Sequence, residues 1–285
     1  MKSGRLFTRT CCLLGLLLST ACGSRTEKAS PDYPEFKMIV RLWPDHHKDS
    51  ALREELLQAL KKYPDFCDEV WLCMEFETFS KEAHKESARA MAVAAERLRN
   101  AGIGVSIQGI TLGHGDDFES GAARPHPELT WGNIVDARNV RTVTSSCPRQ
   151  QAFHDYLGET YALYAGLCRP SCVWLDDDLR VTYHAPARQL CFCDTCLSLF
   201  NRQQGERWTR ETLVEALDRN EGEGRLRRQW ISFCQQSLAE VARTIARAVH
   251  EVSPGTRMGL QHANFHRELL EGRDWNPTLD ALEEE

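Results

Sequence analysis

The stretch SCVWLDDDLRVTYHAPARQLCFCDTCLSLF (Ser171–Phe200) brings together an apolar run, a block of acids and a group of thiols. The run Cys172–Leu175 is typical of a short, fully buried β-strand. It leads directly into Asp176, Asp177 and Asp178, and a Cys-x-Cys-x-x-Cys motif follows after a loop. Because parallel α/β folds place functional side chains just past the carboxyl ends of their strands, the stretch predicts both a fold and a site.

The three acids allow more than one interpretation. If the strand continues through them, Asp176 and Asp178 share one face and Asp177 lies on the other. Neighbouring carboxylates disfavour one another's ionisation, so the pKa of at least one acid is expected to rise, as a general acid for a glycosidic oxygen requires. A solvated Asp-rich turn, an ion pair with Arg180 and an oxygen-ligand site for Mg²⁺ or Ca²⁺ remain open alternatives.

The thiols of the motif predict a metal site. The chain has 12 cysteines, and the motif contributes three of them, at Cys191, Cys193 and Cys196. Thiolates bind Zn²⁺ tetrahedrally, so a fourth ligand is needed, and Cys147 is the candidate. Cys168 and Cys172 are the substitutes for that position. Disulfides and buried free thiols are the alternatives to a structural zinc site.

Apolar strand-like runs alternate with amphipathic helical stretches along the chain. The predicted strands are Phe36–Trp43, Val70–Met74, Val105–Ile110, Cys172–Leu175 and Met258–Gln261. This alternation predicts a parallel sheet with right-handed crossovers. Polar residues just past the strands favour a (β/α)8 TIM-barrel-like fold over a doubly wound open sheet. Only about five β/α units are present, so we expect an incomplete barrel over residues 36–285, either truncated or open.

Several local features accompany these strands. Pro148 suits the first turn of a helix. The segment after the third predicted strand, which contains His114, is expected to be a loop as far as Arg138. Arg41, inside the first strand, is expected to be buried and to pair with an acid such as Glu75. Trp43 and Trp131 are candidates for stacking on sugar rings. Trp71, Trp174 and Trp230 are expected in the core.

Residues 1–21 have the features of a secretory signal peptide, with a basic start and a short apolar run. Ser19-Thr20-Ala21-Cys22 resembles the lipobox of bacterial lipoproteins, which predicts lipidation of Cys22 and a tether over residues 22–35. An ordinary cleaved signal is the alternative. Either interpretation predicts an extracytoplasmic protein, and the first predicts a lipid anchor in a bacterial membrane, periplasmic or at the cell surface.

The overall composition excludes few functions. Of the 285 residues, 42% are hydrophobic and 27% are charged, which is typical of a globular protein. The formal net charge is −6 with both signs interspersed, so the chain has no basic field suited to nucleic acid.

A family resemblance joins the acids and the thiols. The order SSCPRQQAFHDYL, VWLDDDLR and CFCDTCLSLF, over Ser145–Leu157, Val173–Arg180 and Cys191–Phe200, resembles the central part of family-42 glycoside hydrolases, the β-galactosidase type. The resemblance implies a (β/α)8 barrel with the acid/base residue at Asp178. It also implies zinc ligands at Cys147, Cys191, Cys193 and Cys196.

The match has two departures. Asp178 stands where the family has Glu, and Asp177 stands where it has Asn. We expect no counterpart of the family's nucleophilic glutamate of strand seven within this chain.

Three functions follow as hypotheses. The first is a glycoside hydrolase-like lipoprotein that cleaves galactoside-type bonds with Asp178 as general acid/base. The others are a non-catalytic carbohydrate-binding or structural barrel, and a metal-dependent hydrolase using His and Asp at the strand ends. The expected ligand is a carbohydrate, and an oligomer or partner chain is expected to complete the barrel. The predicted substrate-binding residues are Asp176, Asp177, Arg180, His46, Glu75, His114, His184 and His262.

Overall fold

A computed structural model describes residues 38–63, 66–76, 78–113, 129–182, 187, 190–219, 224–262 and 274–284. They belong to one compact unit, Met38–Glu285. Four predictions fall outside the described residues: the signal segment 1–21, the tether 22–35 with Cys22, His114 and His184. Among the described helices, none is long and apolar enough to cross a membrane.

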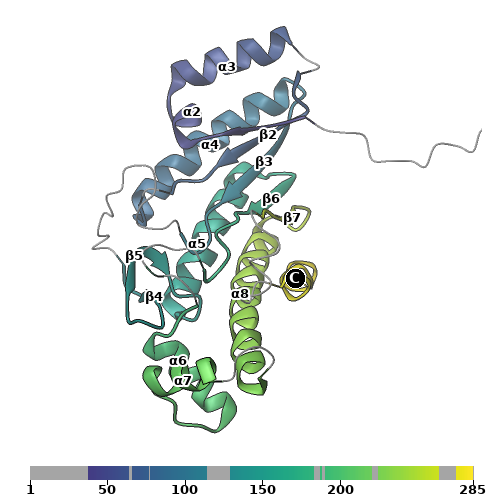
Figure 1. Ribbon diagram of the computed structural model, residues 1–285. Coiled ribbons are helices and arrows are strands. Elements are labelled where there is room, and N and C mark those ends of the chain that lie inside the picture. The colour runs from purple at the N-terminus through teal and green to yellow at the C-terminus, as the bar shows by residue number, and fades with distance from the viewer. Residues whose placement is uncertain are drawn as a thin grey trace, which may run out of the picture. The chain divides into compact units, whose positions relative to one another are not determined.

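Five parallel strands form the central sheet (Figure 1). They are β1 (Ile39–Leu42), β2 (Glu69–Cys73), β3 (Gly104–Gly109), β6 (Cys172–Leu175) and β7 (Arg257–Leu260). Their order in the sheet is β1-β2-β3-β6-β7, so each new strand is added on the same side of the previous one. A doubly wound sheet reverses direction, and this sheet does not within the described residues.

The helices follow the strands in turn. They are α2 (Pro44–Lys48), α3 (Ser50–Lys62), α4 (Lys81–Asn100), α5 (Gln151–Cys168), α6 (Asp194–Gln204), α7 (Arg210–Arg219), α8 (Arg225–Val252) and α10 (Trp275–Glu283). Side-chain oxygens of Asp49, Ser80 and Asp274 cap the first turns of α3, α4 and α10. Helix α4 packs on α5, α5 on α8, and α8 on α10.

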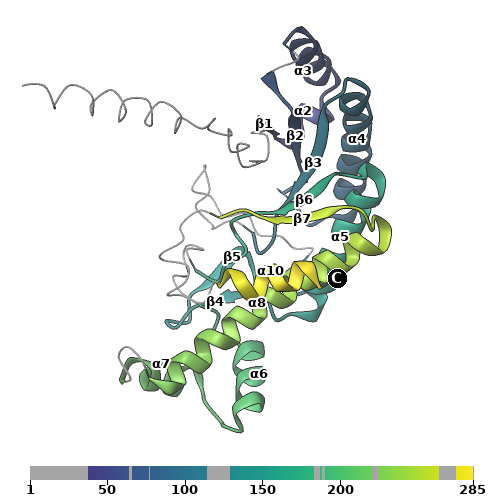
Figure 2. The same cartoon turned by 90° about the vertical axis from the view of Figure 1, so that its right-hand side faces the viewer.

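One face of the sheet is covered by these helices. Val70, Leu72 and Ile107 are fully buried on that face, together with helix residues such as Met91 and Tyr161. Figure 2 shows α4, α5 and α8 on the same side of the strands. Burial of this apolar face stabilises the unit, since each fully buried aliphatic side chain contributes about 1.5–3 kcal/mol.

The other face of the sheet is less covered by described residues. Trp71 and Trp174 are only partly buried and stack on each other with ring centroids 4.6 Å apart. Arg41 is exposed, and its guanidinium lies 4.2 Å from the ring centroid of Trp43. The expectation that Arg41 is buried against Glu75 was therefore wrong, because no closed barrel surrounds it among the described residues.

Of the three tryptophans expected in the core, one is there and two are not. Trp230 is 1% exposed and lies in the core, as expected. Trp71 and Trp174 do not lie in the core, because both project from the less covered face.

A two-stranded antiparallel sheet between β3 and α5 was missed from the sequence. It consists of β4 (Asn133–Val135) and β5 (Arg141–Ser146), in a segment expected to be loop as far as Arg138. The turn between the strands is held by Asp136, whose carboxylate accepts the backbone N–H of Arg138 and Val140. Asn139 adopts φ 63°, a conformation that asparagine tolerates better than most residues.

Helix α5 begins at Gln151, so Pro148 lies before the helix and not in its first turn. The five predicted strands are confirmed: Cys172–Leu175 has the predicted boundaries, and the boundaries of the other four are shifted by one to three residues. The predicted fold class holds in its coarse form: an α/β fold with a parallel sheet of five β/α units that does not close into a barrel within the described residues.

A glycine on β3 allows α5 to approach the sheet closely. A Cβ added at Gly109 would lie 2.3 Å from Cζ of Tyr161, whose side chain is fully buried. We predict that Gly109→Ala destabilises the protein by about 1–3 kcal/mol, because an overpacked core must shift backbone or side chains. Urea unfolding measures this, with Gly255→Ala as the control, since a Cβ there meets nothing within 4 Å. Equal midpoints for the two variants would contradict the prediction.

Candidate functional site

The acids after β6 lie in a turn and not in a continued strand. The strand ends at Leu175, and Asp177 and Asp178 form the turn. The alternation that would place Asp176 and Asp178 on one face therefore does not apply. Both of these side chains are nevertheless buried, at 2% exposed, while the Asp177 side chain is 39% exposed.

Asp176 joins the carboxyl ends of β3 and β6. Its Oδ1 accepts hydrogen bonds from the backbone N–H of Thr111 at 3.0 Å and from its hydroxyl at 2.6 Å. Thr111 lies just beyond β3, so these bonds fix the spacing of two neighbouring strand ends. Sequence reasoning missed Thr111, although it is the second residue after β3, where side chains of functional interest gather.

Asp178 is held by Arg180. The guanidinium donates to Asp178 Oδ1 at 2.6 Å, and it also lies 3.4 Å from Asp177 Oδ2. A buried carboxylate beside a guanidinium is stabilised in its ionised form. The contact agrees with the alternative interpretation, an ion pair with Arg180. It does not favour Asp178 as a general acid, because a general acid needs a protonated carboxyl.

Glu75, at the end of β2, is paired with a lysine that was not predicted. Lys48 Nζ lies 2.6 Å from Glu75 Oε2, and the backbone N–H of Phe76 donates to Oε1 at 3.1 Å. The backbone N–H of Glu75 donates to the hydroxyl of Tyr164 at 3.2 Å. Lys48 lies two residues past His46, and its position just after the first strand was the available signal.

A buried hydrogen-bonded chain of side chains supports Glu75. The Tyr164 hydroxyl lies 3.3 Å from Nδ1 of His84, and Nε2 of His84 lies 2.7 Å from the Tyr156 hydroxyl. Burial lowers the pKa of His84 and raises that of Tyr164 to about 12. Both groups are therefore neutral near pH 7.

The predicted histidines occupy separate places. His46 follows β1 and is partly buried, and its Nδ1 makes no hydrogen bond within the described part of the chain. His262 follows β7, and its ring lies 4.3 Å from that of Trp275, edge to face. Because β1 and β7 are the two outer strands, these histidines lie past opposite edges of the sheet.

The aromatic candidates for sugar contact are partly accessible. Trp43 is 38% exposed, with its ring 5.5 Å from that of Phe76. Trp131 is partly buried beside Phe79 and Tyr156, and its indole N–H donates to Ser146 Oγ at 2.8 Å.

The four predicted thiols come together. Cys147 Sγ lies 3.5 Å from Cys193 Sγ and 3.5 Å from Cys196 Sγ, and with Cys191 all four sulfurs lie within 4.8 Å of one another. Four sulfurs around one Zn²⁺ at about 2.3 Å would be roughly 3.8 Å apart, so the geometry fits a tetrahedral thiolate site. All four side chains are buried, and the nine described cysteines are free thiols.

The electrostatics of the cluster favour a thiolate. Hydrogen bonds from the thiols of Cys147, Cys191 and Cys196 hold the pKa of Cys193 far below that of a free thiol. The pKa of Cys147 is raised, mainly by its hydrogen bonds with Cys191 and Cys193. Thiolate is the metal-binding form of cysteine, so the donor set suits a soft divalent metal.

The cluster joins three parts of the chain. Backbone hydrogen bonds attach Phe192 to Val135 at 2.6 Å and Cys147 to Gly132 at 3.0 Å. The ring of Phe192 stacks on Trp230 of α8 with centroids 4.8 Å apart. The β4–β5 hairpin, the segment before α6 and helix α8 therefore meet beside the thiol cluster.

Comparisons with known proteins identify a fold. No protein-family model matches the chain, and no curated protein matches it. Among solved structures, a β-galactosidase from the Antarctic haloarchaeon Halorubrum lacusprofundi aligns with TM-score 0.57 and 14% identity, over 86% of this chain and 39% of that one. The β-galactosidase of the psychrophilic Marinomonas ef1 gives 0.57 and 12%, over 87% and 40%.

A third β-galactosidase, from Bacillus circulans sp. alkalophilus, gives TM-score 0.52 and 15% identity, over 81% of this chain and 37% of that one. The chain thus spans 37–40% of the length of these structures. At such identities the likeness shows the fold alone: a glycoside hydrolase-like α/β fold of the TIM-barrel type.

The thiol cluster generates the first prediction for this site. Cys147→Ser is expected to reduce bound zinc and to lower the melting temperature, because a metal ligated only in the folded state stabilises that state. Elemental analysis and calorimetry measure both effects. Cys172→Ser is the control, since Cys172 is buried in β6 outside the cluster. Protein that contains no zinc after purification without chelators would contradict the metal assignment.

The second prediction concerns pH. His47 is fully buried, and burial together with the Lys48 charge lowers its pKa to about 4. The unfolded state therefore binds more protons between about pH 6.5 and 4, so the stability from this group is present above pH 6.5 and is lost as the pH falls. We expect the free energy of unfolding to decrease by about 2 kcal/mol between pH 7 and 5. Denaturant titrations check this, and an unchanged slope in His47→Gln would contradict it.

Proposed function

We propose that this chain is a glycoside hydrolase-like protein that binds carbohydrate at the carboxyl ends of its parallel strands. The observation that carries the proposal is the acid-bearing turn Asp176–Asp178, at the carboxyl end of a central strand, in a fold shared with β-galactosidases. Enzymes of the TIM-barrel type bind their substrates at this end of the sheet.

The side chains past the strands suit a sugar. Asp177 is accessible, and its carboxylate can accept hydrogen bonds from hydroxyl groups. Trp43 presents part of an apolar ring beside Phe76, past the carboxyl end of the edge strand β1. A mixture of hydrogen-bonding groups and aromatic rings is typical of sites for neutral polar ligands.

Hydrolysis with Asp178 as general acid/base is a second candidate, favoured by its place after the fourth strand of the sheet. The Arg180 contact opposes it, because the guanidinium stabilises the ionised carboxylate. Both common mechanisms also need a second carboxylate, about 5–10 Å away. Glu75 is held by Lys48, so we assign no described residue to that role. Binding is therefore the activity that this chain supports best.

We also propose that the four thiols hold a structural Zn²⁺, supported by their burial and spacing. A closed set of four thiolates leaves no open coordination position, so the ion would fix the loops and would not activate water.

For residues 1–22 we propose a signal segment with lipidation at Cys22, supported by the sequence pattern alone. Retention of a metabolically supplied fatty acid by Cys22→Ser would exclude it.

The proposal predicts how the protein behaves toward galactosides. We expect saturable lactose binding by calorimetry and weak or no turnover of a chromogenic β-galactoside. Asp177→Ala is expected to weaken binding about tenfold, because a hydrogen bond to a charged group contributes about 1.5–3 kcal/mol. Asp218→Ala, on α7, is the matched control for removal of a surface acid.

Turnover would decide the second candidate. Turnover that is lost in Asp178→Asn and retained in Asp178→Glu would establish hydrolysis through this residue. If the parent protein neither binds lactose nor turns over the galactoside, the proposed function is contradicted.

A further inference from the structure

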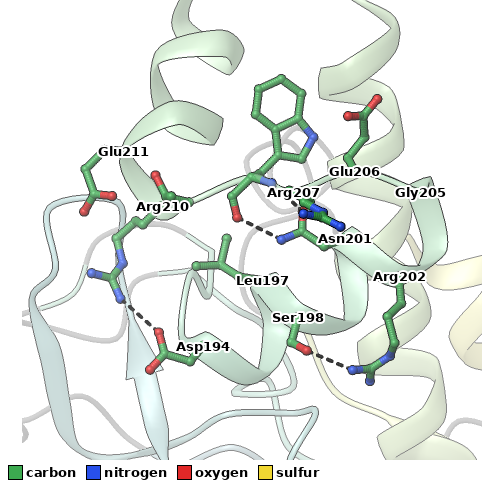
Figure 3. A pocket seen from close by; sticks show the side chains of 12 residues that line it. Asp194, Leu197, Ser198, Asn201, Arg202, Gly205, Glu206, Arg207, Arg210 and Glu211 are labelled. Carbon is green, nitrogen blue, oxygen red and sulfur yellow. Dashed lines mark hydrogen bonds and ion pairs between the residues drawn. The ribbon is translucent and has the colours of Figure 1, made fainter.

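We propose that the hollow between α6 and α7 is a second carbohydrate-binding site, which takes a neutral oligosaccharide and is separate from the strand ends (Figure 3). The cavity has a volume of about 810 Å³, within the range of small-ligand sites. The choice of carbohydrate as ligand class rests on the proposed function. The existence of the site rests on the hollow itself and on the contacts that fix its walls.

The segment that carries Trp208 is fixed in place. Asn201 Nδ2 donates to the carbonyl oxygen of Trp208 at 2.8 Å, and the backbone N–H of Trp208 donates to Asn201 Oδ1 at 2.9 Å. Gly205, with φ 70°, ends α6 just before this segment. Both polar backbone groups of Trp208 are thus held by one side chain, so little conformational entropy is lost when a ligand contacts the ring.

The other wall of the hollow is also fixed. Helix α6 begins directly after Cys193, in the thiol cluster. Arg210 of α7 donates through Nε to the carbonyl oxygen of Phe192 at 3.1 Å, and it approaches Asp194 to 3.8 Å. The thiol cluster and Arg210 therefore set the spacing of the two helices.

The charges around the hollow balance. Its ionisable lining consists of Arg202, Arg207, Arg210, Asp194, Glu206 and Glu211. Figure 3 shows Asp194, Arg210 and Glu211 at one end, and Arg202 and Glu206 at the other, so neither end has a single sign. Three cations and three anions favour neither an anionic nor a cationic ligand over the other.

The same groups suit a sugar. Guanidinium and carboxylate groups offer paired donors and paired acceptors, which match the neighbouring hydroxyls of a pyranose ring. Trp208 is partly buried, so an apolar surface lies beside these groups. Arg207 is exposed and makes no hydrogen bond or ion pair within the described residues, so its donors are available to a ligand.

Fluorine NMR of the full chain labelled with 5-fluorotryptophan tests this site directly. The chain has seven tryptophans, and each signal is assigned by its loss in a Trp→Phe variant. The probe is β-1,4-galactotetraose, with inorganic phosphate and spermidine as charged comparisons. We expect the Trp208 signal to shift saturably with the sugar only, while buried Trp230 serves as the internal reference.

A pair of arginines on the chain supplies a matched control. Arg207→Ala is expected to weaken the Trp208 response about tenfold, since a few well-placed residues dominate most binding sites. Arg219→Ala, at the end of α7 and outside the hollow, is expected to leave it unchanged. Equal effects of the two substitutions would overturn the assignment.

The tryptophan signals separate this inference from the proposed function. A shift of Trp43 or Trp131 with Trp208 unmoved would overturn the second site and keep the strand-end site. A shift of Trp208 alone would support the second site and overturn the strand-end proposal. A larger Trp208 shift with phosphate or spermidine than with the sugar would identify an ion site and overturn the inference.

Discussion

Strands β3 and β6 pair in parallel through Ile107, Gln108 and Gly109, although the whole β4–β5 hairpin and helix α5 lie between them in the chain. A parallel pair cannot be closed by a tight turn, so the connection must cross one face of the sheet. The helix that makes this crossing approaches the sheet closely, because Gly109 leaves room for the ring of Tyr161. The hairpin is left at the carboxyl edge of the strands, and it delivers Cys147 to the other three thiols. The strand pairing thus determines where both the acids and the thiols meet their partners.

The acids and the thiols then serve different purposes. Asp176 accepts hydrogen bonds from Thr111 and so connects the ends of β3 and β6, and Asp178 forms an ion pair with Arg180. Only Asp177 keeps a substantially exposed carboxylate. This arrangement suits hydrogen bonding to a ligand better than proton transfer, because a buried carboxylate paired with a guanidinium loses little by remaining ionised. The thiol cluster joins Cys147, just after β5, to the three cysteines at the start of α6, so the proposed second site depends on it for its shape.

Much of the fold could be predicted because strands buried by helices leave continuous apolar runs, such as VWLC in β2, and helices leave a period of 3.6. The four thiols were found because ligand spacing is local for three of them, and Cys147 was chosen from the family resemblance and its position. The hairpin was missed because its turn depends on Asp136 binding backbone N–H groups, which an ordinary loop composition does not reveal. The contacts of Lys48 with Glu75 and of Thr111 with Asp176 depend on which strand ends become neighbours. Only Arg180 is close enough in sequence to its acid to have been considered.

The central claim is that carbohydrate binds at the carboxyl ends of the parallel strands. A crystal structure of the protein soaked in lactose tests it most directly. The account predicts difference density for a sugar within hydrogen-bonding distance of Asp177, with the Asp178–Arg180 pair unbroken. A sugar bound only between α6 and α7, or a sugar that displaces Arg180 from Asp178, would contradict it.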